Sequence, residues 1–448
     1  MLLRSRAGRN FATVVVLLAT TFALGAQAQA AEKAFWGPAT LPDGSSAFGL
    51  YDELGIDTLQ LSVVWSDVAV TRPANPRDPS DLAYHWPAEV DAAVAEAAGH
   101  GIRILLLVKA TPAWANGRRS PTWTPTNPRD YADFLAAAAR RYPLVRRWMI
   151  WGEPNRHDRF QPNKTNSALG PRAYARLLDA AYVALKSANR QNIVIGGNTW
   201  TSGTVKPPDF LRWLRLPNGR RPRLDWFGHN PFPFRFPKLA NTPLRGGYRD
   251  MSDLDTLSAE ARRTFGRRVP LWLSEYTIQS DRGSRVFATY VSRAAQGRYL
   301  SAGFRIADDL GPAVAGIGWL TLLDEPPAPE SANLGLLTAA LQRKPAFAAM
   351  ALAPSERARP AVRVASSVRR AALRSRTGLT VTVTPRATGS IRVDLRRGTK
   401  LWVRTRVPGV AGRAATARLR SRRAAAGRYV VAVRAPRGAT VRRSVLVR

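Results

Sequence analysis

Residues 147–155 read Arg-Trp-Met-Ile-Trp-Gly-Glu-Pro-Asn, an apolar run that ends abruptly at Glu153. A second run, Leu-Trp-Leu-Ser-Glu-Tyr at 271–276, leads in the same way into Glu275. Continuous apolar runs of this length are typical of strands that are buried on both faces, as the strands of parallel sheets are. Each run therefore predicts a buried parallel strand that ends in a glutamate.

Similar apolar runs recur along the chain and alternate with segments of helical period. The expected strands are 34–36, 58–64, 102–108, 147–151, 192–196, 224–228, 270–274 and 315–322, and the expected helices are 87–98, 128–141, 171–188, 254–265 and 284–301. About eight strand and helix units in about 320 residues favour a (β/α)₈ barrel, an α/β fold. The alternative is an open doubly wound sheet, but the Gly-rich phosphate loop expected after its first strand is missing.

The composition is that of a folded protein without thiol chemistry. The 448 residues are 45% hydrophobic and 22% charged, which excludes a mostly disordered chain. The sequence holds 0 cysteines and 4 histidines, so disulfides, thiolate catalysis and Cys-ligated metals are excluded and a His-rich metal site is not expected. We therefore expect no cofactor and no metal.

The formal net charge of +37 is concentrated in the last fifth of the chain. Of the 68 Lys+Arg residues 25 lie after residue 350, against 2 of the 31 Asp+Glu residues. Short runs at 379–385, 391–395, 401–407 and 429–433, separated by Gly and Pro, predict a small all-β, immunoglobulin-like sandwich here. We expect a catalytic barrel over 31–352, a linker over 353–361 and an Arg-rich accessory domain over 362–448.

The first thirty residues have the pattern of a secretory signal peptide. Arg4, Arg6 and Arg9 precede an apolar run at 11–24, and small residues lead to Ala28 and Ala30, where cleavage is expected. The alternative is a membrane anchor, but the run is short for a span of about 20 residues. The sequence thus predicts residues 1–30 to be a signal peptide, and a secreted, extracellular protein, in part cell-wall associated, with no integral membrane segment after cleavage.

Two glutamates at strand ends have a chemical meaning in a barrel. The carboxyl ends of all eight strands meet at one mouth, where active sites of this fold form. A carboxylate that follows directly from the core is costly to bury without a partner or a function. Two of them across one gap suit glycoside hydrolysis, which needs one protonated acid and one ionised nucleophile or base. The alternative is that Glu153 and Glu275 cap helices or pair with arginines.

Trp151-Gly-Glu-Pro-Asn155 and Leu273-Ser-Glu-Tyr276 resemble the acid/base and nucleophile motifs of retaining glycoside hydrolases of clan A. Among these, the chain is most similar to families 39 and 5 over about residues 31–352, including Thr111-Pro-Ala-Trp-Ala115. The resemblance implies that Glu153 is the acid/base and Glu275 the nucleophile. It also implies two-step hydrolysis of a β-glycoside in a plant or microbial polysaccharide or oligosaccharide, with the carboxyl groups about 5–5.5 Å apart.

The sequence departs from that pattern at two places. Gly152 stands where these families usually place an Asn that contacts the sugar 2-hydroxyl, and the segment from His229 to Pro233 lacks their usual Tyr. Aromatic faces and polar groups near strand ends are candidates for sugar contacts. The substrate-binding candidates are Lys109, Trp114, Asn155, Asn198, His229, Asn230, Tyr276 and Trp319.

Each of these candidates has an alternative reading. Trp114 and Trp319, favoured among the tryptophans at strand ends (Trp65, Trp114, Trp123, Trp200 and Trp319), otherwise pack the barrel top. By resemblance, Trp319 matches a tryptophan that lies under the sugar. Lys109 binds either a hydroxyl or carboxylated sugar, or one of the two glutamates.

Three functions compete on the sequence. The first is a secreted β-glycosidase with a carbohydrate substrate. The second is a barrel weakened by Gly152 and Phe232 that binds a glycan or the cell wall without cleaving it. The third, a nucleic-acid binder, is not expected because the tail offers only Trp402 and Tyr429 for base stacking. We expect the Arg-rich tail to bind an anionic cell-wall polymer; the alternative is that its arginines reflect genome composition.

Overall fold

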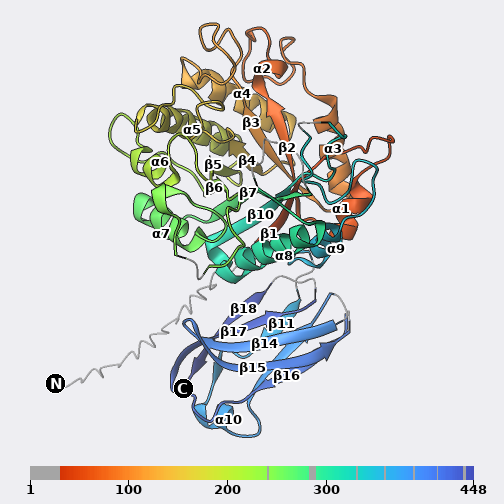
Figure 1. The fold of residues 1–448 in the computed structure, drawn as a ribbon. Helices are drawn as coiled ribbons and strands as arrows, with labels where there is room; N and C mark the ends of the chain where they lie inside the picture. Colours follow the sequence, from red (N-terminus) through yellow and green to blue (C-terminus); the bar gives the residue numbers. More distant parts are fainter. Residues whose placement is uncertain are drawn as a thin grey trace, which may run out of the picture.

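The computed structural model describes residues 31–239, 242–281, 289–328, 331–357, 360–386, 389–410, 412–436 and 440–448. The predicted signal peptide lies outside these residues. A closed barrel of eight parallel strands forms the first domain (Figure 1), which confirms the predicted fold class. Its strands in chain order are β1 (Glu32–Trp36), β2 (Thr58–Val64), β3 (Arg103–Lys109), β4 (Arg147–Ile150), β5 (Ile193–Trp200), β6 (Trp226–Asn230), β7 (Leu271–Tyr276) and β10 (Val314–Leu320).

Helices surround the barrel, as in the predicted alternation. They are α1 (Phe48–Leu54), α2 (Trp65–Val68), α3 (Ala88–Gly99), α4 (Pro128–Arg141), α5 (Leu169–Ala188), α6 (Pro207–Trp213), α7 (Leu254–Phe265), α8 (Arg293–Leu310) and α9 (Pro345–Leu352), with 3₁₀ turns at Arg245–Gly247 and Gly311–Ala313. The helix predicted at 284–301 begins later than expected, at Arg293, because Ser292 is extended and caps it by accepting from the Ala295 amide. Among the described residues, no helix is both long and apolar enough to cross a membrane.

The barrel interior is apolar in its middle and ionic at the amino-terminal end of the strands. Leu105, Leu107, Met149, Ile195 and Trp272 form the central layer. Below it, the fully buried carboxylate of Glu32 accepts from Arg147 Nη2 at 2.5 Å and Thr58 Oγ1 at 2.6 Å, and lies 3.3 Å from Arg103 Nη2. This cluster joins strands β1, β2, β3 and β4 at the end of the barrel where the chain enters them.

A bulge in β7 turns Glu275 toward the mouth. Ile317 and Trp319 of β10 pair with Leu273 and Tyr276 of β7, so three steps along β7 match two along β10. Leu273 and Tyr276 both face the outer core, which leaves the inner side to the residues between them. Bulges of this kind re-aim side chains next to active sites.

The second domain is the predicted β-sandwich. One sheet has the order β11-β13-β16 and the other β12-β18-β17-β14-β15. These strands are β11 (Ala361–Val364), β12 (Ser367–Val368), β13 (Leu379–Thr384), β14 (Gly389–Arg397), β15 (Lys400–Gly409), β16 (Ala415–Leu419), β17 (Gly427–Arg434) and β18 (Val441–Val447), with helix α10 (Arg370–Arg374) between β12 and β13. Its core is aliphatic around Tyr429.

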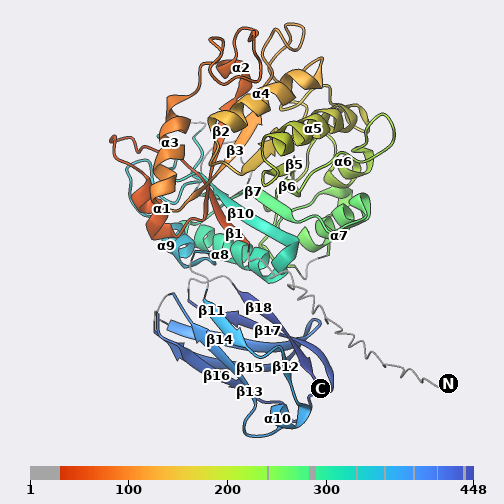
Figure 2. The same cartoon turned by 180° about the vertical axis from the view of Figure 1, so that it is seen from behind.

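Both views place the sandwich beside helices α8 and α9 (Figures 1 and 2). Asp308, buried in the last turn of α8, pairs with Arg434 and accepts from Thr440 N at 3.0 Å and Thr440 Oγ1 at 2.6 Å. After α9, the backbone amides of Glu356 and Arg357 each donate to buried Asp57 at 2.8 Å. Part of the expected linker is therefore fixed to the barrel.

The Glu32 cluster generates a stability prediction. Removing one partner of a buried ion pair leaves an uncompensated charge and costs about 3–5 kcal/mol, so Glu32→Ala should lower the free energy of unfolding by about that amount. The control is Glu53→Ala, because Glu53 pairs with Arg343 at 2.6 Å on the surface, where such pairs contribute about 0–1 kcal/mol. Denaturant titration measures both losses, and equal losses would contradict the assignment.

Candidate active site

Glu153 follows β4 through a strained turn at the barrel mouth. Trp151 and Glu153 have left-handed φ values of 64° and 49°, and Ala110, Asn198 and Thr321 at neighbouring strand ends have values of 65°, 42° and 70°. Non-glycine residues in this region are strained and gather at functional sites. The Glu153 amide donates to Asn198 O at 3.1 Å, which fixes the turn to β5. The strain is thus concentrated at the mouth of the barrel.

The Glu153 carboxylate is held from two sides. Arg156 Nη1 donates to Glu153 Oε2 at 2.8 Å, and Asn230 Nδ2 at the end of β6 donates to Oε1 at 3.1 Å. Arg156 is itself fixed by Asp158, through bonds of 3.0 and 2.6 Å, and lies over the ring of Trp200 at 4.6 Å. Hydrogen bonds to charged groups are strong and directional, so these two bonds fix the direction of the Glu153 carboxyl group.

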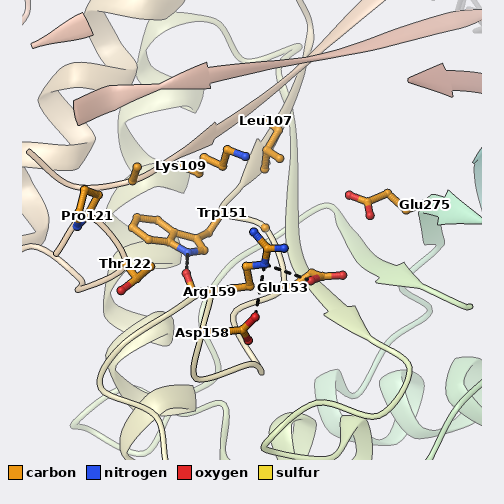
Figure 3. A pocket seen from close by; sticks show the side chains of 11 residues that line it. Leu107, Lys109, Pro121, Thr122, Trp151, Glu153, Asp158, Arg159 and Glu275 are labelled. Atoms are coloured by element: carbon orange, nitrogen blue, oxygen red, sulfur yellow. Dashed lines mark hydrogen bonds and ion pairs between the residues drawn. The ribbon is translucent and has the colours of Figure 1, made fainter. Parts of the chain in front are cut away.

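Glu275 faces the same space from the opposite side of the mouth (Figure 3). It is half-buried and has no hydrogen-bond or ion-pair partner within the described part of the chain. Burial first, and the charge of Glu153 second, raise the pKa of Glu275 to about 8, against the opposing effects of Lys109, Arg159 and Arg156. Two like charges that face one gap repel each other, so the free protein favours the proton on Glu275.

The two glutamates line two hollows that adjoin each other. One is a cavity of about 370 Å³ bounded by Lys109, Thr122, Trp151 and Arg159, and the other, of about 360 Å³, is bounded by Trp200, Phe232, Phe234 and Thr277. Glu153, Glu275 and Arg159 contribute to both. The carboxyl groups therefore stand at the boundary between two spaces.

Lys109 continues the inward-facing series of Leu105 and Leu107 at the end of β3. Its side chain lies beside Leu107 and extends into the first cavity (Figure 3). No ion pair or hydrogen bond of its ammonium group is found among the described residues. It is a cation available to a ligand and to Glu275.

The other predicted binding residues differ in what holds them. Asn198 is fully buried, and its side-chain amide has no partner among the described residues. Asn155 spans the β5 loop, donating to Trp200 O and Val205 O at 3.0 Å. His229 is enclosed between Thr199 Oγ1 and Arg249 O, both at 2.8 Å, and burial lowers its pKa to about 4. Asn155 and His229 therefore serve the scaffold.

The favoured aromatic candidates also belong to the scaffold. Trp319 is fully buried and donates to Leu334 O at 3.1 Å, while Tyr276 packs edge-on against it and donates to Tyr299 O at 2.6 Å. Trp114 donates to Ala69 O at 2.8 Å and lines neither hollow. In the free protein these three residues, Asn155 and His229 are thus bonded or packed within the scaffold, and their role in substrate binding stays a prediction.

The sequence predicted Lys109 at this site but not the two arginines, Arg156 and Arg159. Arg156 and Arg159 line the mouth because the chain after Glu153 turns back over it. A signal was present, since two arginines flank Asp158 directly after the glutamate motif, but their direction depends on the loop. Trp200, named only as one of several tryptophans at strand ends, is the one that lines a hollow. No cluster of three or more His, Cys, Asp or Glu suited to a metal ion occurs in the described ranges.

The structure is similar to solved glycoside hydrolases. A glucosidase from Croceicoccus marinus aligns with a TM-score of 0.54 at 13% identity, over 88% of this chain and 94% of that one. A family 39 glycoside hydrolase from Bacteroides cellulosilyticus gives 0.52 at 15% over 88% and 80%, and a monomeric β-xylosidase from Caulobacter crescentus gives 0.50 at 15% over 88% and 94%. The sequence matches no protein-family model and no curated protein. These similarities confirm the fold that the resemblance implied. Because the sequence identities are so low, they show the fold and not the activity.

The raised pKa of Glu275 predicts a pH-dependent stability. The ordinary pKa of this carboxyl group is 4.5, and its pKa in the folded chain is about 8. Between these two pH values the unfolded chain has lost the proton and the folded chain retains it. The free energy of unfolding of wild type therefore falls as the pH rises through this window. The side chain of the Glu275→Gln variant cannot ionise. The melting temperature of the variant minus that of wild type should therefore increase from pH 5 to pH 8. Exposed Glu89→Gln on α3 is the control, with no such trend. A Glu275→Gln advantage that is constant with pH would refute the assignment.

Proposed function

We propose that the chain is a glycosidase, an enzyme that hydrolyses O-glycosyl compounds, and that it acts on a β-glycoside. The observation that carries this proposal is the pair Glu153 and Glu275, which face one gap at the carboxyl ends of barrel strands and line two adjoining hollows. A glycosidic bond needs a space for the sugar on each side of it, with two carboxyl groups at the boundary.

In the proposed retaining cycle, Glu275 attacks the anomeric carbon while Glu153 gives its proton to the departing oxygen. The bond to the leaving sugar breaks and a glycosyl ester forms on Glu275. In the second step, Glu153 takes a proton from a water whose oxygen attacks the same carbon, and the Glu275 carboxylate is released. Asn230 positions the Glu153 carboxylate through its 3.1 Å bond.

The cycle starts with the proton on Glu153, whereas the free protein favours it on Glu275. A substrate oxygen that accepts a hydrogen bond from Glu153 favours the protonated form of that residue, and Lys109 stabilises the charge left on Glu275. We therefore propose that substrate binding moves one proton across the gap. This step uses the single proton that the pair already shares.

The roles predict two different rescue products. With an activated aryl β-glycoside, Glu275→Ala and Glu153→Ala should each lose at least about 10³-fold in kcat, because each removes a group that acts in the transition state. Azide should restore turnover in both. It enters from the vacated nucleophile side in Glu275→Ala and gives the α-glycosyl azide, whereas in Glu153→Ala it attacks the glycosyl-enzyme and gives the β-glycosyl azide.

The anomeric configuration is read by NMR. The same two products from the opposite variants would reverse the roles of the two glutamates. Near-wild-type turnover of either variant would refute the mechanism. Phe236→Leu, a change outside both hollows, is the control for expression and folding and should keep its activity.

A second candidate is a barrel that binds glycan without cleaving it. Two observations favour it. Arg156 forms an ion pair of 2.8 Å with Glu153, and Gly152 stands at the position where an Asn side chain was expected. Glycan-array binding by correctly folded protein, without release of reducing ends from any bound glycan, would favour this candidate over the enzyme.

We also propose that the protein is exported, which rests on the signal-peptide pattern of residues 1–30. Expressed in its native host, the mature protein should be found outside the cells with Ala31 or Gln29 at its amino terminus. Amino-terminal sequencing by mass spectrometry tests this, and an intracellular protein that retains Met1 would contradict it.

A further inference from the structure

The sandwich carries a row of three adjacent arginines on the sheet that faces the barrel. Arg392 on β14 lies directly opposite Arg406 on β15 and directly opposite Arg434 on β17. Like charges directly opposite each other on neighbouring strands destabilise a sheet. A negative charge beside such a row therefore reduces the repulsion among its arginines.

The row opens onto a cleft between the two domains. The cleft, of about 500 Å³, is bounded by helices α8 and α9 and by strands β14, β15 and β17. Its charged lining consists of Arg305 from α8 and the three arginines of the row, and Ser301 and Ser390 add hydroxyl groups. No Asp or Glu is among the described residues that bound it.

The neighbouring acids neutralise only part of this charge. Asp308 and Asp309 pair with Arg434, and Asp394 lies 3.7 Å from Arg392 but also 2.8 Å from Arg404. Burial, and then the charge of Arg434, lower the pKa of Arg392. Arg305 and Arg406 are exposed and form no ion pair within the described residues.

We propose that this cleft is a binding site for the carboxylate groups of an acidic polysaccharide. Guanidinium groups match carboxylates in shape and bind them through paired hydrogen bonds, and the two serines suit sugar hydroxyls. The described lining of the cleft holds no aromatic ring on which a nucleic-acid base could stack. The carboxylates of the acidic polysaccharide offset the positive charge of the arginine row.

The site lies away from the proposed catalytic centre. Asp308 and Asp57, which fix the sandwich and the linker, are found just before the starts of β10 and β2, whereas Glu153 and Glu275 lie at the opposite ends of the strands. A polymer held in the cleft therefore tethers the protein and leaves the barrel mouth free. The proposal stands whether or not the barrel is an enzyme.

The test compares two double variants of the full chain that lose the same charge. Arg392→Gln with Arg406→Gln removes the two cations of the row without an extensive ion pair. Arg418→Gln with Arg420→Gln removes two exposed cations at the end of β16, which belongs to the other sheet. Calorimetric titration with polygalacturonate at 50 mM NaCl should show at least about a tenfold loss of affinity for the first variant and less than about twofold for the second. Wild-type affinity should also fall about tenfold by 200 mM NaCl.

Three results would overturn the proposal. Equal losses in the two double variants would mean that net charge alone attracts the polymer. Tighter binding of dextran sulfate or of a short DNA duplex than of polygalacturonate, with the same dependence on the row, would assign the cleft to another anion. Unchanged affinity of the first variant would exclude the cleft. If that variant melts earlier than wild type, the single Arg406→Gln replaces it.

Discussion

Two carboxyl groups share one buried gap at the barrel mouth, and they cannot both be charged there without cost. The surrounding structure resolves this conflict unevenly. Arg156, held in place by Asp158 and Trp200, fixes the Glu153 carboxyl group by a hydrogen bond. Glu275 has no hydrogen-bond or ion-pair partner among the described residues, and its pKa is raised to about 8. An arrangement with one proton between two acids is what a reaction with one acid and one nucleophile uses.

The backbone around the mouth is shaped by the same requirement. The bulge in β7 turns Glu275 inward, and left-handed residues at the ends of β3, β4, β5 and β10 direct the loops around the gap. Strain of this kind persists only where the rest of the fold is well fixed. The buried Glu32 cluster holds four strands together at the other end of the barrel. The stabilising ion pairs and the proposed catalytic residues therefore lie at opposite ends of the strands.

The sequence predicted the barrel because its strands are uninterrupted apolar runs, and the segment 58–64 coincides with β2. In the sandwich the sequence did not predict β11, β12, β16 and β18. The first three have only 4, 2 and 5 residues, and the apolar run of β18 is interrupted by Arg442-Arg443-Ser444. The sequence predicted Glu153, Glu275 and Lys109 at the cavity, since each ends an apolar run. It could not separate Glu275 from Tyr276 by direction, because a bulge reverses the alternation of side chains and leaves no mark in the sequence. Arg156 and Arg159 reach the mouth only through the fold of their loop.

The claim that matters most is that Glu275 bonds covalently to the substrate sugar. Activated 2-deoxy-2-fluoro β-glycosides slow the release of such an intermediate, so incubation followed by peptide mass spectrometry locates the attached sugar. We expect one label per chain, on the peptide that contains Glu275, and none in Glu275→Gln. A label on Glu153, or turnover that inverts the anomeric configuration with no label at all, would contradict it.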